Sequence, residues 1–111
     1  MSASFVASLR TRPDTVRVAR DGEPTVSVRV QMPEAWDVVR FVASPTTPVS
    51  TLKLRALEEL APGSRYPDDF VFKLRGWEVL DERAPLAEVG VQDGSILLLI
   101  SRRKRPVRRG G

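Results

Sequence analysis

The fold is decided by residues 74–86, which read LRGWEVLDERAPL. Leu74 ends an alternating apolar stretch, and Gly76 turns the chain because glycine reaches backbone angles that other residues avoid. After this turn, Val79-Leu80 predicts a short strand, and Leu86 begins a compact, turn-rich connection. The segment therefore indicates two strands joined by a tight turn.

Alternating apolar and polar residues on both sides of this segment predict the remaining strands. Residues 70–75 alternate directly before the turn, and residues 95–100 form an aliphatic strand after an Asp-Gly turn. Nearer the start of the chain, residues 25–32 and 36–43 both alternate. Pro33-Glu34-Ala35 lies between them as a turn, so the two strands form a hairpin.

One helix is predicted between the hairpin and the later strands. Thr47 is expected to cap it, with Pro48 at the first helical position and Pro62-Gly63 closing it. Apolar residues then recur at helical spacing, which predicts one buried face. They are Val49, Leu52, Ala56, Leu57 and Leu60.

This order of elements, with two strands, a helix, a strand, a short strand and a long final strand, is that of the β-grasp fold. Residues 74–86 resemble the ubiquitin family's segment apolar-x-Gly-x-x-Leu-x-Asp-x-Arg-x-Leu, with one extra residue at Ala84 or Pro85. Residues 90–95 match the family's approach to its last strand. Lys53 falls where ubiquitin carries a helix lysine.

The resemblance covers residues 25–111 and is completed by the final Arg-Gly-Gly. It implies an α+β, ubiquitin-like β-grasp domain over residues 25–101, with a mixed sheet packed on one helix. Residues 102–111 would form a basic flexible tail, longer than that of ubiquitin. Residues 1–24 have no counterpart and are expected to be a largely disordered extension, with strand character at residues 15–19.

The charge is concentrated in the tail. The chain has 18 basic and 14 acidic residues, yet residues 1–100 carry a net charge of −2. A basic tail binds either nucleic acid without sequence preference or an acidic groove on a protein partner, and the sequence leaves both open. Six basic residues fall within the last eleven positions, namely Arg102, Arg103, Lys104, Arg105, Arg108 and Arg109.

The composition argues against an enzyme. The chain has no Cys and no His, so it lacks a thiol nucleophile, the commonest general base and the usual transition-metal ligands. No cofactor and no metal site is expected. No apolar run is long enough to cross a membrane, and a cytoplasmic location is the default expectation. The excess of Arg over Lys favours a GC-rich, bacterial genome.

The resemblance implies that the protein is a substrate of other enzymes. An adenylating enzyme would activate the carboxylate of Gly111 and carry it as a thioester, and a conjugating enzyme would pass it to lysines of target proteins as an isopeptide bond. A peptidase would cleave that bond. Gly110 and Gly111 give the end no bulk. Arg108 and Arg109 would pair with acids of the activating enzyme.

The target, and whether chains form on Lys53, Lys73 or Lys104, stay open at the level of sequence. Bacterial gene clusters with adenylating, conjugating and isopeptide-cleaving enzymes resemble antiviral defence systems, which suggests a defence role.

The partner surface is expected on the outer face of the sheet. Leu97 and Leu99 should point inward, which leaves Leu98 and Ile100 outward beside Lys73. Trp36 is assigned to the same surface. The N-terminal extension could instead cover these residues, or pair with a sheet edge of a second molecule and cause self-association.

Two other functions remain. Sulfur carriers share the β-grasp fold and the terminal Gly-Gly, but their adenylated end becomes a thiocarboxylate. A non-covalent adaptor would use the basic tail to hold nucleic acid. The tail has no aromatic residues for base stacking, so sequence-specific binding to nucleic acid is not expected, and nucleic acid is not among the expected partners.

Overall fold

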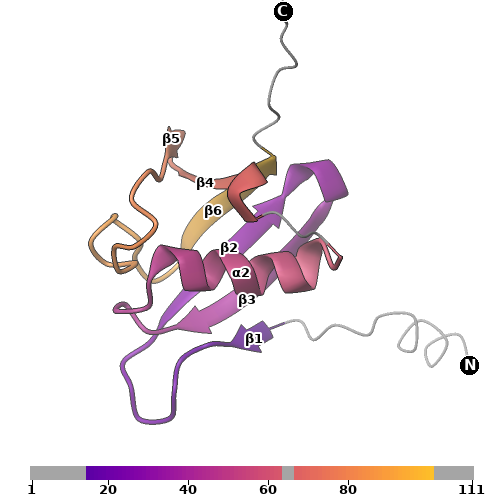
Figure 1. The fold of residues 1–111 in the computed structure, drawn as a ribbon. Coiled ribbons are helices and arrows are strands. Elements are labelled where there is room, and N and C mark those ends of the chain that lie inside the picture. Colours follow the sequence, from indigo (N-terminus) through magenta and orange to yellow (C-terminus); the bar gives the residue numbers. More distant parts are fainter. Residues whose placement is uncertain (1–14, 64–66, 102–111) are drawn as a thin grey trace, which may run out of the picture.

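The computed structural model describes residues 15–63 and 67–101, which form a six-stranded sheet covered by one long helix (Figure 1). The predicted extension before Thr15 and the predicted tail after Ser101 lie outside these residues. The elements are β1 (Thr15–Arg17), β2 (Val26–Met32), η1 (Pro33–Ala35), β3 (Asp37–Ala43), α2 (Val49–Leu60), η2 (Pro67–Asp69), β4 (Phe70–Leu74), β5 (Trp77–Glu78) and β6 (Ser95–Ser101).

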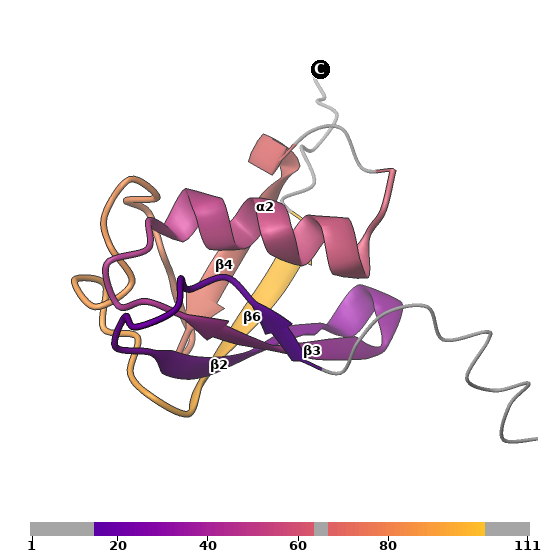
Figure 2. The same ribbon diagram turned by 90° about the horizontal axis from the view of Figure 1, so that it is seen from below.

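The sheet is mixed, with the strand order β1-β3-β2-β6-β4-β5. β2 and β3 form the predicted antiparallel hairpin, and β5 pairs antiparallel with β4. β6 lies in the middle, parallel to β2 and antiparallel to β4. Figure 2 shows α2 lying across one face of this sheet. The predicted architecture, a mixed sheet packed on one helix, is confirmed.

The core lies between α2 and the sheet, and strand alternation decides which residues enter it. Phe41 of β3, Phe72 of β4 and Leu99 of β6 are fully buried there against Leu52 of the helix. The predicted inward pair, Leu97 and Leu99, is confirmed. The other face of the sheet has no helix over it among the described residues.

The helix begins differently from the prediction. Thr47 does not cap it: Pro48 is the N-cap residue, and no side chain caps the first turn. Instead, the amide of Val49 donates to the carbonyl of Ala84 at 3.0 Å, and the amide of Ser50 donates to the carbonyl of Glu82 at 2.8 Å. The loop after β5 therefore supplies the acceptors that a capping side chain usually provides.

The short strand also differs from the prediction, because it comprises Trp77–Glu78 and not Val79-Leu80. Arg75 (φ 55°) and Gly76 (φ 86°) form a two-residue turn with positive φ at both positions. So short a turn makes pairing start at once, with Trp77 opposite Leu74. Beyond this pair, Val79 is buried and its amide donates to the carbonyl of Phe72 at 2.8 Å.

β1 belongs to the sheet, although the sequence assigned it to the N-terminal extension. It pairs parallel with the edge of β3, and Val16 is buried in the common core. The amides of Val18 and Ala19 both donate to the carbonyl of Val42. The predicted strand character is confirmed in a shorter form, and the pairing lies within one molecule. The compact unit thus includes residues before Thr25.

Among the described residues, no helix is both long and apolar enough to cross a membrane.

Candidate functional site

The candidate site is the outer face of the sheet, opposite α2. Strand pairing places its side chains in rows that cross the strands. One row joins Val38, Gln31, Leu98 and Lys73, because each is the register partner of the next. The face has an apolar half on β6 and β4 and a cationic half on β2 and β3.

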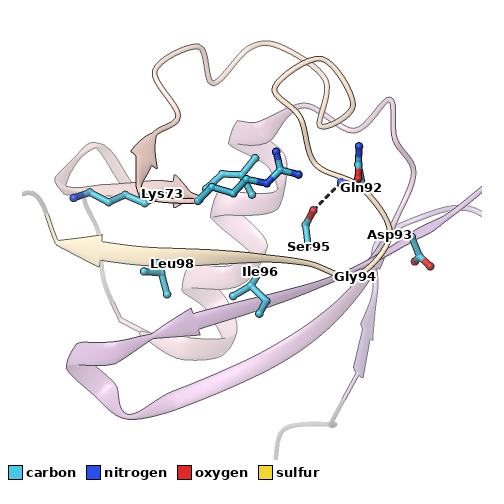
Figure 3. Close-up of a pocket in the computed structure, with 10 residues that line it drawn as sticks. Lys73, Gln92, Asp93, Gly94, Ser95, Ile96 and Leu98 are labelled. Carbon is cyan, nitrogen blue, oxygen red and sulfur yellow. Dashed lines mark hydrogen bonds between the residues drawn. The ribbon is translucent and has the colours of Figure 1, made fainter.

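The apolar half contains most of the predicted partner surface. Lys73 lies opposite Leu98, and Val71 lies opposite Ile100. Leu98 and Ile100 are both half-buried, while Ile96, which shares their side of β6, is 43% exposed. Figure 3 shows Ile96 and Leu98 projecting from the same side of the strand. The outward orientation of Leu98 and Ile100 is therefore confirmed.

A shallow hollow adjoins this half, between the turn that joins β4 to β5 and the turn that precedes β6. It is lined by Lys73, Ile96 and Leu98 together with residues of both turns. The second turn is fixed by two hydrogen bonds. The amide of Gln92 donates to Oγ of Ser95 at 2.8 Å (Figure 3), and the amide of Ser27 donates to Oδ1 of Asp93 at 2.7 Å.

Trp36 lies apart from Lys73, at the end of the β2–β3 hairpin. Its φ of 54° ends the short helix η1, its amide donates to the carbonyl of Pro33 at 3.1 Å, and its side chain is 95% exposed. A second hollow there is lined by Trp36, Gln31 and Val38 among others. On the outer face, Gln31 lies between Trp36 and the apolar half, because it lines the hollow of Trp36 and is the register partner of Leu98.

Within residues 15–24, nothing covers Leu98 or Ile100. β1 lies at the far edge of the sheet, with β3 and β2 between it and β6. The predicted cover by the extension could therefore come only from residues 1–14, which lie outside the described residues.

The predicted conjugation residues Gly110 and Gly111, and the recognition residues Arg108 and Arg109, lie outside the described residues. The last described residue, Ser101, is fixed in place: its amide donates to Oε1 of Glu34 at 3.1 Å. The end of β6 is therefore joined to η1, next to Trp36. The chain continues from this point into Arg102 and the basic tail.

Lys53, one of the three lysines named as possible sites of chain formation, has a structural role. It is 2% exposed, its Nζ donates to the carbonyl of Phe70 at 3.0 Å, and both carboxylate oxygens of Glu82 lie 2.8 Å from it. The pair joins the helix to the start of β4 and to the capping loop. An amine held in this way is closed to an activated carbonyl, and among the described residues Lys73 is the accessible lysine.

The sequence interpretation missed part of this face. Ile96 has the same strand parity as Leu98 and Ile100, so alternation alone could have identified it. Arg29 and Arg40 face each other across β2 and β3, and the hairpin register is the signal that would have paired them. In the described residues, no group of Asp and Glu is arranged to hold a metal ion.

No family model matches the sequence, and no curated protein matches it. Solved structures do match the fold. A ubiquitin-like domain of an Arabidopsis thaliana protein has a TM-score of 0.62 and 16% identity, covering 83% of this chain and 93% of that one. Caldiarchaeum subterraneum ubiquitin has a TM-score of 0.60 and 18% identity, covering 73% and 98%.

The UBL domain of Plasmodium falciparum Dsk2 gives the same TM-score and identity, 0.60 and 18%, covering 70% of this chain and 99% of that one. At these identities the similarity concerns the fold alone. The chain therefore has a ubiquitin-like β-grasp fold.

Proposed function

We propose that this protein is a ubiquitin-like modifier, activated at Gly111 by an adenylating enzyme and joined to lysines of target proteins. One combined observation supports the proposal most: a ubiquitin-like domain leads from its central strand β6 directly into a segment that ends in Arg-Gly-Gly. The domain would be bound as a rigid body, while the last residues enter the ATP site.

Activation requires attack of the terminal carboxylate on the α-phosphate of ATP, with loss of pyrophosphate. A cysteine of the activating enzyme then displaces AMP and forms a thioester. A conjugating enzyme would carry out the last step, in which the amine of a target lysine displaces the thiol and forms the isopeptide bond. Gly110 and Gly111 have no side chains to obstruct a narrow channel. Arg108 and Arg109 would form charge-assisted hydrogen bonds with acids of the activating enzyme.

The outer face of the sheet gives the partner enzymes a rigid surface. Ile96 and Leu98 form its apolar centre and Lys73 its charged margin, all on neighbouring strands. Exposed aliphatic groups of this kind are typical of protein interaction sites. The hydrogen bond between Ser101 and Glu34 fixes where the tail leaves this surface, so the enzyme would bind both together.

The test is thioester formation with adenylating enzymes of the same genome. With ATP, the wild type should form an adduct that reducing agents release. Gly111→Ala should slow its formation and deletion of Gly110-Gly111 should abolish it, whereas Thr51→Ala, on the exposed side of α2, should have no effect. A thioester formed by the deletion variant contradicts the proposal. A terminal thiocarboxylate, detected by mass spectrometry, would identify a sulfur carrier instead.

Recognition by the tail is tested separately. Replacing Arg108 and Arg109 with Glu should weaken binding to the activating enzyme, because the charges that pair with its acids are reversed. The melting temperature should stay the same. A drop in melting temperature would mean that these residues stabilise the domain, and would contradict the recognition role.

A further inference from the structure

The cationic half of the outer face carries an arrangement that the modifier proposal does not use. Arg29 of β2 and Arg40 of β3 are direct register partners, so their side chains leave the same side of the sheet next to each other. Both are exposed, and no side-chain hydrogen bond or ion pair joins either guanidinium group to a described residue. Like charges directly opposite each other destabilise a sheet, so an anion between them would stabilise it.

The surface next to the two arginines is suited to a flat ring. Arg29 and Arg40 line one hollow with Gln31 and Val38. The same Gln31 and Val38 line the hollow of Trp36, so the two hollows are neighbours. Trp36 is 95% exposed on a backbone that a hydrogen bond fixes. A cationic pair and an exposed indole therefore lie on one short path across the sheet.

We propose that this surface, formed by Arg29, Arg40, Gln31 and Trp36, binds single-stranded nucleic acid. A backbone phosphate would lie between the two guanidinium groups, which match its oxygens in geometry and charge. An adjacent base would stack on Trp36, and the amide of Gln31 would bond to its edge. Stacking platforms combined with basic grooves are the usual means of binding single strands without sequence preference.

The basic residues that follow β6 in the sequence would add to the attraction between this surface and the nucleic acid. β6 ends beside η1 and Trp36, and the chain then continues into Arg102, Arg103 and Lys104. The tail itself has no aromatic residue on which a base could stack. In the folded domain Trp36 can take that role, because it lies beside the end of β6, from which the tail departs.

The combined features favour a single strand over other anions. In a double helix the bases are stacked inside, so Trp36 would have nothing to stack on. An acidic peptide would satisfy the arginine pair but repeats no planar group beside its charges. A nucleotide chain offers a phosphate and a flat base in every unit, which fits both neighbouring hollows.

The test is fluorescence anisotropy with a short labelled single-stranded oligonucleotide, the full chain and a series of salt concentrations. Trp36→Ala should weaken binding about tenfold or more, because stacking on that residue is lost. The double variant Arg29→Gln/Arg40→Gln should weaken binding at low salt. Its plot of log affinity against log salt should be shallower by about 0.7, which corresponds to the one phosphate contact that the two arginines share.

Trp77→Ala is the matched control. Trp77 is also exposed, at 78%, but it lies on β5 at the far side of the sheet, so its removal should leave the affinity unchanged. Equal affinity for the wild type, Trp36→Ala and the arginine double variant would show that the tail alone binds, and would overturn the proposal. The proposal would also be overturned if poly-glutamate or duplex DNA displaced the labelled oligonucleotide as effectively as an unlabelled single strand does.

This inference stands apart from the modifier function. Deleting Gly110-Gly111 should leave oligonucleotide binding intact. The double variant Arg29→Gln/Arg40→Gln should leave thioester formation intact, because the modifier proposal uses neither arginine. Circular dichroism on each variant confirms that it is folded. Since the substituted side chains are exposed, no loss of fold is expected.

Discussion

Removing the carboxylate of Glu82 should destabilise the domain far more than removing the amine of Lys53. The ammonium of Lys53 has three protons and three acceptors, which are the two oxygens of Glu82 at 2.8 Å and the carbonyl of Phe70 at 3.0 Å. Glu82→Ala removes two of these acceptors and the countercharge. The Lys53 side chain is only 3% exposed, so water cannot replace them fully.

The magnitude follows from this asymmetry. Leaving one charge of a buried pair unpaired costs about 3–5 kcal/mol. The Glu82 side chain is 26% exposed, so some water reaches the vacated space, and we expect the lower end, about 3 kcal/mol. For a domain of this size that lowers the melting temperature by about 15 °C. Lys53→Met removes the buried charge and leaves the Glu82 carboxylate, which is 26% exposed and can be hydrated, so it should cost clearly less than Glu82→Ala.

Urea unfolding followed by circular dichroism measures these differences in the free energy of unfolding. Urea carries no charge, so it does not screen the ion pair as a salt denaturant would. Tryptophan fluorescence is a poor probe here, because Trp36 and Trp77 are already exposed in the folded state. Glu58→Ala is the control, since its ion pair with Arg55 lies on the helix surface and should contribute less than about 0.5 kcal/mol. If Lys53→Met costs as much as Glu82→Ala, the reasoning about the buried charge is wrong.

Three further outcomes are expected. Val16→Ala should lower the free energy of unfolding in urea by about 2 kcal/mol, because the Val16 side chain is buried in the core. Thr15→Ala, on the exposed side of β1, should change it little, and equal effects would mean that β1 does not pack on the core. Gly76→Ala should lower the free energy of unfolding by about 1 kcal/mol, because φ at this position is +86°. The added methyl group meets no neighbouring atom, so the backbone strain alone sets the cost, and an unchanged melting temperature would contradict the turn geometry. Deleting residues 1–22 should uncover the β3 edge and raise the mass seen by light scattering, whereas two monomeric species would exclude pairing between molecules.

Much of the fold could be predicted from the sequence because apolar periodicity reports burial directly. The helical stripe identified Leu52 as a core residue. Residues 96–100 are aliphatic throughout, so periodicity gave two possible faces there, and the expected inward pair, Leu97 and Leu99, is the buried one. The start of the helix could not be found in this way. Its capping groups are carbonyls of Glu82 and Ala84, which only the folded chain brings to the first turn.

The candidate site was predictable only in part. Strand parity correctly placed Leu98 outward, but it says nothing about which strands are neighbours. The contact between Gln31 and Leu98, and the opposition of Arg29 and Arg40, depend on the order and register of the strands. The burial of Lys53 could not be predicted either, because a lysine on a helix usually faces solvent. Its amine is buried against Glu82, which is distant in the sequence.

The central position of β6 also determines how the domain responds to mechanical force. β6 is hydrogen-bonded along both sides, and the chain leaves it at Ser101. A pull on the C-terminal end acts along the strand axis, so the bonds to β2 and β4 carry the load together and are not opened one after another. A molecular motor that grips the tail would therefore meet the most resistant element first. One that engages the edge strand β1, whose partner lies on one side only, would unravel the sheet at lower force.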